Sequence, residues 1–231
     1  MIPLKNLSSR RSAPIVTLLL IVANVVVFLH QVTISPAADD RLIKAFGMVP
    51  VKIQYALAGT HHVTLAQALI PLFTCMFLHA GFLHILGNMW FLWIFGANVE
   101  DRMGPFVYLL FYLVCGIGSS VSQALFSWGS PVPSIGASGA ISGVLGAYVL
   151  FFPASRILTL IPLFIFWFTL RIPAIVFIGL WFLIQFLSGI WSLGMASGGG
   201  VAWWAHVGGF LIGLFLAKGV RGRPADAWEE I

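Results

Sequence analysis

Charged side chains are scarce in this chain. Asp, Glu, Lys and Arg make up 8% of its 231 residues, and hydrophobic residues make up 60%, whereas a soluble domain carries about 25% charged and about 45–50% apolar residues. A soluble globular protein needs many more polar side chains to cover its surface, and the mean hydropathy of +1.00 indicates an apolar exterior. The composition excludes a disordered chain and predicts a polytopic membrane protein.

The low cysteine content and the distribution of charge exclude two further classes of protein. Only two cysteines occur in 231 residues, so the chain is not a disulfide scaffold. Its net charge of +5 comes from twelve basic and seven acidic residues, but the basic residues are dispersed and form no stripe of the kind that binds nucleic acid. We therefore interpret the positive charge as a determinant of membrane topology and predict no nucleic-acid partner.

Apolar segments of membrane-crossing length recur along the chain. A crossing needs about 17–25 mostly apolar residues. Six such segments are predicted, near residues 13–31, 80–98, 105–126, 137–152, 172–192 and 201–217. They form a membrane domain at residues 13–218, between an N-terminal tail at residues 1–12 and a C-terminal tail at residues 219–231. The expected fold is an all-α bundle of six transmembrane helices.

The segment Ile157–Leu170 is apolar but is not counted as a crossing. It is short, contains Pro162 and lies between Arg156 and Arg171. If it lies along the membrane interface, six crossings place both tails on one face together with most of the basic residues, and that face is expected to be cytoplasmic. The long first external loop, roughly residues 32–78, is expected to lie partly on the membrane surface.

Acidic residues are absent from the predicted hydrocarbon region. The seven are Asp39, Asp40, Glu100, Asp101, Asp226, Glu229 and Glu230. Their positions in loops and tails argue against an intramembrane aspartyl protease and against a carboxylate proton relay. The chain has no His-Glu-x-x-His string, and His79 and His84 project about 140° apart around a helix. We therefore predict no metal site and no cofactor.

The polar side chains within the predicted spans gather at one depth. A rise of 1.5 Å per helical residue, counted from the cytoplasmic charges, places them roughly 18–24 Å above the cytoplasmic boundary. They are His84, Asn88, Cys115, Ser138, Gln185 and His206. Depth alone does not select the chemistry, but Cys115 lies mid-helix and is interpreted as a small buried apolar residue.

Ser138 has the local sequence expected of a nucleophile. It stands in Gly136-Ala137-Ser138-Gly139, after a proline-rich turn and at the start of a span. A serine there lies near free backbone amides and the positive end of the helix dipole, where an oxyanion is stabilised. The flanking Gly136 and Gly139 permit a tight turn and the close approach of a peptide. The alternative is an ordinary helix cap with glycines at packing positions.

His206 is the candidate general base for this serine. It lies at a similar depth and can accept a proton at neutral pH. Its neighbours Gly209 and Gly213 form a small-residue face, which is expected to pack closely against Gly139 and Gly143. Such an approach is needed for a hydrogen bond between the histidine and the serine. Alternatively, a single intramembrane histidine bonds a neighbouring helix without a catalytic role.

His84 and Asn88 are candidate donors to an oxyanion. Their i, i+4 spacing places both on one face of the second span. Two neutral donors aimed at one point, together with the backbone amide of Ser138, would form an oxyanion hole. A small-molecule transporter would carry a similar intramembrane polar cluster, but the sequence shows no convincing inverted repeat.

With these residues assembled, the chain resembles the rhomboid family of intramembrane serine proteases. The resemblance covers about Pro14 to Lys218. The strings that carry it are His79-x4-His84-x3-Asn88, Glu100-x3-Gly104, Gly136-x-Ser138-Gly139 and Ala205-His206-x2-Gly209-x3-Gly213. It implies an endopeptidase that cleaves transmembrane protein substrates in or near their membrane segments. The small core predicts a bacterial cytoplasmic membrane as its location, with the membrane of an organelle as the alternative.

The resemblance also implies roles for single residues. Ser138 would be the nucleophile and His206 its base, in a dyad without an acid. His84 and Asn88 would bind the oxyanion, and His79 would order the loop above them. The supporting glycines are Gly136, Gly139 and Gly209. The fifth span would form a lateral substrate gate with Trp181, Phe182 and Gln185.

The chain departs from the family pattern at two places. Members often carry Trp-Arg shortly before the first histidine, where this chain has Ala68-Leu69-Ile70-Pro71. Many members place a tyrosine four residues after the nucleophile, where this chain has Ser142, so another group must orient the ring of His206. The alternative function is a catalytically silent rhomboid-like protein that binds transmembrane clients.

Overall fold

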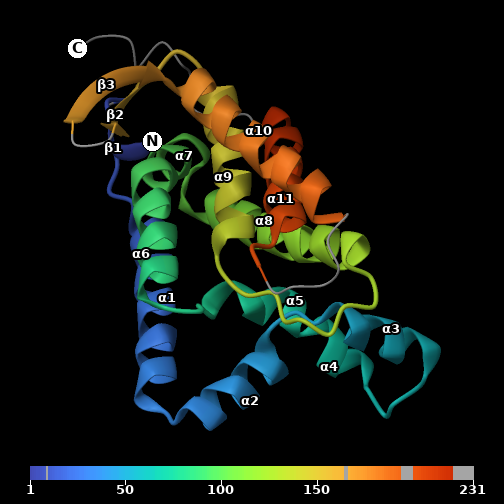
Figure 1. Cartoon of the computed structure of the whole chain (residues 1–231). Coiled ribbons are helices and arrows are strands. Elements are labelled where there is room, and N and C mark those ends of the chain that lie inside the picture. Colours follow the sequence, from blue (N-terminus) through green and yellow to red (C-terminus); the bar gives the residue numbers. More distant parts are fainter. Residues whose placement is uncertain (9, 164–165, 194–199, 221–231) are drawn as a thin grey trace.

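The protein is mostly helical. The structure, a computed structural model, describes residues 1–8, 10–163, 166–193 and 200–220. Long helices lie between a small β-sheet at one end of the molecule and a group of short helices at the other end (Figure 1). Most of the predicted C-terminal tail, residues 221–231, lies outside the described residues.

A helix coincides with each of the six predicted spans. The helices are α1 (Ile15–Thr33), α6 (Phe82–Phe91) continued by the π-helical turn η2 (Leu92–Gly96) and α7 (Ala97–Met103), α8 (Pro105–Phe126), α9 (Ser138–Phe151), α10 (Ala174–Leu193) and α11 (Trp203–Lys218). Four are long and apolar enough to cross a membrane: α1, the continuous helix α6–α7, α8 and α10. The helices α9 and α11 are apolar but shorter.

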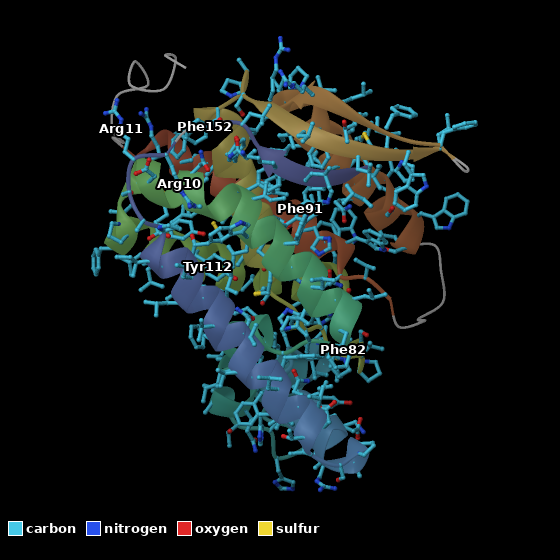
Figure 2. The ribbon with its side chains drawn as sticks, turned by 90° about the vertical axis from the view of Figure 1, so that its left-hand side faces the viewer. Arg10, Arg11, Phe82, Phe91, Tyr112 and Phe152 are labelled. Atoms are coloured by element: carbon cyan, nitrogen blue, oxygen red, sulfur yellow. The ribbon has the colours of Figure 1, made fainter. Side chains whose placement is uncertain are left out.

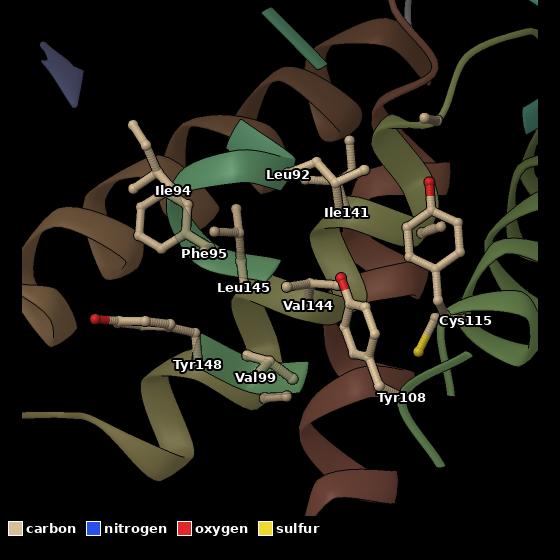
Figure 3. Packing of buried hydrophobic residues seen from close by; sticks show 14 of the residues in the cluster. Leu92, Ile94, Phe95, Val99, Tyr108, Cys115, Ile141, Val144, Leu145 and Tyr148 are labelled. Atoms are coloured by element: carbon tan, nitrogen blue, oxygen red, sulfur yellow. The ribbon is translucent and has the colours of Figure 1, made fainter. Parts of the chain in front are cut away.

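The short helix α9 lies in the core of the molecule. Every residue from Gly139 to Tyr148 is buried, and Val144 and Leu145 lie among side chains of η2 and α8 (Figure 3). The helix therefore contacts protein rather than lipid over this stretch. A loop can precede it at membrane depth because irregular backbone is tolerated where protein surrounds it.

Glycines bring α9 and α11 into backbone contact. A Cβ atom on Gly209 would lie 2.1 Å from the carbonyl oxygen of Gly139, and one on Gly213 would lie 2.1 Å from that of Gly143. No side chain fits at such separations. The small-residue face predicted from the sequence is confirmed.

The fold is mostly helical, as predicted, but it also contains three strands that the all-α prediction did not include. The antiparallel sheet has the order β1 (Ile2–Asn6), β2 (Arg156–Leu163) and β3 (Phe166–Pro173). The predicted interfacial segment is thus the strand pair β2 and β3. Part of the predicted N-terminal tail forms β1. Backbone pairing with β1 satisfies the polar groups on the edge of β2, whose side chains Ile157 and Thr159 are buried.

The long first loop is folded into short helices. They are α2 (Pro36–Phe46), α3 (Pro50–Ala58), α4 (Leu65–Leu69), α5 (Pro71–Thr74) and the 3-10 turn η1 (Cys75–Phe77). Side-chain hydroxyl groups cap the N-termini of α2 and α4. Ser35 accepts a hydrogen bond from the backbone amide of Ala38, and Thr64 accepts one from that of Gln67. These helices form the end of the molecule opposite the sheet (Figure 1).

Two acids of α7 hold the start of α1. The Glu100 carboxylate accepts the backbone amides of Val16 and Thr17, both at 2.8 Å, and the Thr17 hydroxyl at 2.7 Å. Asp101 accepts the amides of Arg11 and Ser12 and the Ser12 hydroxyl. Both acids are buried. Glu100 satisfies orphan amides in the first turn of α1, at the positive end of the helix dipole, and Asp101 holds the segment just before that turn. The helix α1 lies beside α6 (Figure 2). The Phe28 ring packs edge-on against the Phe82 ring at 5.0 Å.

Replacing Glu100 by glutamine is expected to destabilise the protein by about 1–3 kcal/mol, because the amide removes the charge and one acceptor oxygen from a buried site. Thermal unfolding in detergent measures the effect. The matched control is Asp40→Asn, since Asp40 forms an exposed pair with Lys44 at 2.7 Å and such pairs contribute about 0–1 kcal/mol. Equal unfolding temperatures for the two variants would contradict this account.

Candidate active site

Ser138 and His206 are in hydrogen-bond contact. The distance between Ser138 Oγ and His206 Nε2 is 2.7 Å, although the residues are 68 positions apart in the sequence. Ser138 is the first residue of α9, and His206 lies in the first turn of α11. The glycine contacts between these helices hold the two side chains at this separation. The arrangement can transfer a proton from the hydroxyl to the imidazole.

The start of α9 presents backbone donors beside Ser138. The first hydrogen bond of this helix runs from the amide of Ile141 to the carbonyl of Ala137. The amides of Ser138, Gly139 and Ala140 therefore precede the intrahelical bonds. Amides at the positive end of a helix can stabilise a developing oxyanion.

Gly136 allows a histidine ring to approach this site. Its φ of +123° lies in a region that favours glycine. A Cβ atom at this position would lie 2.7 Å from His84 Nε2 and 3.7 Å from Ser138 Oγ. Any other residue here would displace the His84 ring, so the predicted supporting position has a steric cause.

The contacts of His84 favour a proton on Nε2, the ring nitrogen nearest Gly136. The amide of Ala80 donates to His84 Nδ1 at 3.2 Å, so the neutral ring carries its hydrogen on Nε2. Asn88, one turn further along α6, donates one amide hydrogen to the carbonyl of His84 at 2.8 Å. The structure thus places a neutral N–H donor beside Ser138, with a buried amide on the same face of α6.

His79 is held by a residue that sequence analysis did not identify. Gln31, near the end of α1, accepts the backbone amide of His79 at 3.0 Å and donates to its carbonyl at 3.2 Å. The ring of His79 packs edge-on against that of His84 at 5.1 Å. The only sequence signal for Gln31 is a polar residue at the end of an apolar segment.

The ring of His206 has a second polar neighbour. Its Nδ1 lies 2.7 Å from Gln185 Oε1 on α10, and the Trp181 ring lies 6.0 Å away. Ser142, at the position where many rhomboids have tyrosine, turns its hydroxyl back to the carbonyl of Ser138 at 2.6 Å. Cys115 is fully buried, as expected for a small core residue.

A family profile covers this site. The profile of the Rhomboid domain matches residues 66–223, which contain the described contact between Ser138 and His206. The chain belongs to the rhomboid family. As a rhomboid protein with apolar helices of membrane-spanning length, it is an integral, multi-pass membrane protein.

Relatives with rhomboid names occur in plants, bacteria and yeast. The chain is 33% identical over 159 residues to RHOMBOID-like protein 6, mitochondrial, of Arabidopsis thaliana, covering 69% of this chain and 46% of that protein. It is 46% identical over 76 residues to Rhomboid protease GluP of Bacillus subtilis, covering 33% and 14%. It is 31% identical over 186 residues to Rhomboid protein 1, mitochondrial, of Saccharomyces cerevisiae, covering 73% and 47%. The chain spans less than half the length of each of these relatives.

Proposed function

We propose that this rhomboid protein is an intramembrane serine endopeptidase that works with a Ser138–His206 dyad. The observation that carries the proposal is the 2.7 Å contact between Ser138 Oγ and His206 Nε2. The protease name of the Bacillus subtilis relative supports the same class of activity. No cofactor enters the reaction.

In this mechanism Ser138 Oγ attacks the carbonyl carbon of a substrate peptide while His206 Nε2 takes the hydroxyl proton. The amide of Ser138 and the Nε2–H of His84 donate to the oxyanion, and Asn88 is the third proposed donor. Collapse of the tetrahedral intermediate breaks the C–N bond, and His206 returns the proton to the leaving amine. Water then hydrolyses the acyl-enzyme by the same route, which restores the serine.

The proposed topology has six membrane crossings, with both termini in the cytoplasm of a bacterial cell. The dyad then lies toward the outer end of the bundle, on the side of α2–α5 rather than of the sheet (Figure 1). The substrates are transmembrane helices, entering beside α10. A helix hides its backbone carbonyls, so cleavage is expected near residues that weaken helices, such as glycine and proline.

A fluorophosphonate probe tests this proposal, because it bonds covalently to an activated serine. The purified protein in detergent is expected to be labelled, and peptide mapping is expected to place the label on Ser138. Heat-denatured protein is the control, since a serine without its base is not activated. Absence of label on Ser138 in the folded protein would favour the alternative, a catalytically silent protein that binds transmembrane clients.

A further inference from the structure

We propose that Gln185 is the positioning residue that holds His206 in the tautomer required of a base. The proposal rests on the dyad proposed above and deepens it. A histidine that accepts the Ser138 proton on Nε2 must carry its own hydrogen on Nδ1. Gln185 Oε1 lies 2.7 Å from that Nδ1, where it accepts this hydrogen.

The chemistry of the two contacts on His206 is mutually consistent. If Nδ1–H donates to Gln185, then Nε2 has a free lone pair directed at Ser138 Oγ, 2.7 Å away. The opposite tautomer would place a lone pair on Nδ1 facing the amide oxygen, which is also an acceptor. Repulsion between two acceptors disfavours that tautomer, so the amide oxygen selects the reactive form.

Burial strengthens this selection. Gln185 is 7% exposed and His206 is 8% exposed, so little water can replace the hydrogen bond if it is lost. Leaving a buried donor without its partner costs about 1–3 kcal/mol. A buried amide at membrane depth is itself costly unless it is bonded, and the bond to His206 offsets that cost.

Ser142, which stands where many rhomboids have a tyrosine beneath the histidine, does not orient the His206 ring. Ser142 bonds the carbonyl of Ser138 within its own helix. Gln185 instead comes from α10, whose described buried residues are Ala174, Phe177, Ile178, Gln185 and Gly189. The orienting bond to His206 therefore runs between helices, from α10 to α11.

The experiment compares cleavage of a tagged single-span substrate by wild type, Gln185→Leu and Gln185→Glu. Leucine has a similar volume but no acceptor, so kcat is expected to fall about a hundredfold while KM stays within about threefold. Glutamate keeps an acceptor oxygen at the same reach, and its kcat is expected to recover to within about tenfold of wild type. Ser192→Ala is the control, because it removes a 2.6 Å hydrogen bond within α10 and is expected to keep wild-type kcat.

A second measurement does not depend on substrate. In protein with 15N-labelled histidine, the NMR chemical shifts of Nδ1 and Nε2 of His206 report which nitrogen carries the proton. Gln185→Leu is expected to change them toward a mixture of tautomers, and Gln185→Glu is expected to preserve the Nδ1–H form. Identical His206 shifts in wild type and Gln185→Leu would overturn the proposal. If the fluorophosphonate probe did not label Ser138, the proposed dyad would be refuted. The chemical shifts of His206 would still report its tautomer.

Discussion

Replacement of Ser138 or His206 by alanine is expected to reduce cleavage of a tagged single-span membrane substrate at least about a thousandfold. In the proposed mechanism, Ser138→Ala removes the atom that attacks the peptide carbonyl. His206→Ala removes the proposed base, 2.7 Å from that atom, so the hydroxyl would keep its proton and remain a weak nucleophile. The rate of product formation, in cells and in proteoliposomes, measures both effects.

The double variant distinguishes a dyad from two independent contributions. If the serine and the histidine act as one unit, as proposed, removing both is expected to reduce the rate no further than removing either one. The control variants are Ser155→Ala, whose hydroxyl bonds Tyr148 and the carbonyl of Phe152, and His30→Ala, an exposed residue of α1. Both are expected to keep activity. Undiminished cleavage by Ser138→Ala would contradict a mechanism with Ser138 as the nucleophile.

Substitution of Gly213 by alanine is expected to reduce both stability and activity. The added Cβ would lie 2.1 Å from the carbonyl oxygen and 2.4 Å from the Cα of Gly143, so a backbone has to move. Overpacking of this kind costs about 1–3 kcal/mol or more. A displacement of roughly 1 Å between α9 and α11 would also lower the cleavage rate about a hundredfold, because it separates His206 from Ser138.

Gly179→Ala is the matched control for this prediction. The position lies in α10, and a Cβ atom there meets nothing within 4 Å. Alanine is favoured over glycine in a helix by about 0.8–1.0 kcal/mol, so this variant is expected to be as stable as wild type or more so. Thermal unfolding in detergent and the cleavage rate are measured on both variants. An unfolding temperature for Gly213→Ala equal to that of Gly179→Ala would contradict the close packing of α9 and α11.

The membrane helices were predictable because their signals are local. A run of apolar residues between charged loops identifies each segment without reference to the rest of the chain. The pairing of Gly209 and Gly213 with Gly139 and Gly143 was also predictable, since small residues spaced four apart indicate the face of a helix that packs closely. The strand β1 was missed because its partner Arg156–Leu163 is far away in the sequence, and five residues next to a terminus carry no local signal of pairing.

For the candidate site, the sequence indicated the residue types but not their protonation. The residue types of Ser138, His206, His84 and Asn88 and their places in helical segments already indicated a serine hydrolase site. Their tautomers did not follow from the sequence, because the proton on each ring depends on what the other nitrogen contacts. Ala80 determines this for His84, and its place four residues earlier could have suggested it.

The sequence by itself determined that this protein enters a membrane, that six apolar segments are helical and which few polar groups lie among them. These properties depend on composition and on spacing within single segments. Only the tertiary structure decided that Glu100 holds the start of α1, that Gln31 holds His79 and that Gln185 contacts His206. Each is a hydrogen bond between distant segments, and its geometry exists only after the helices have packed.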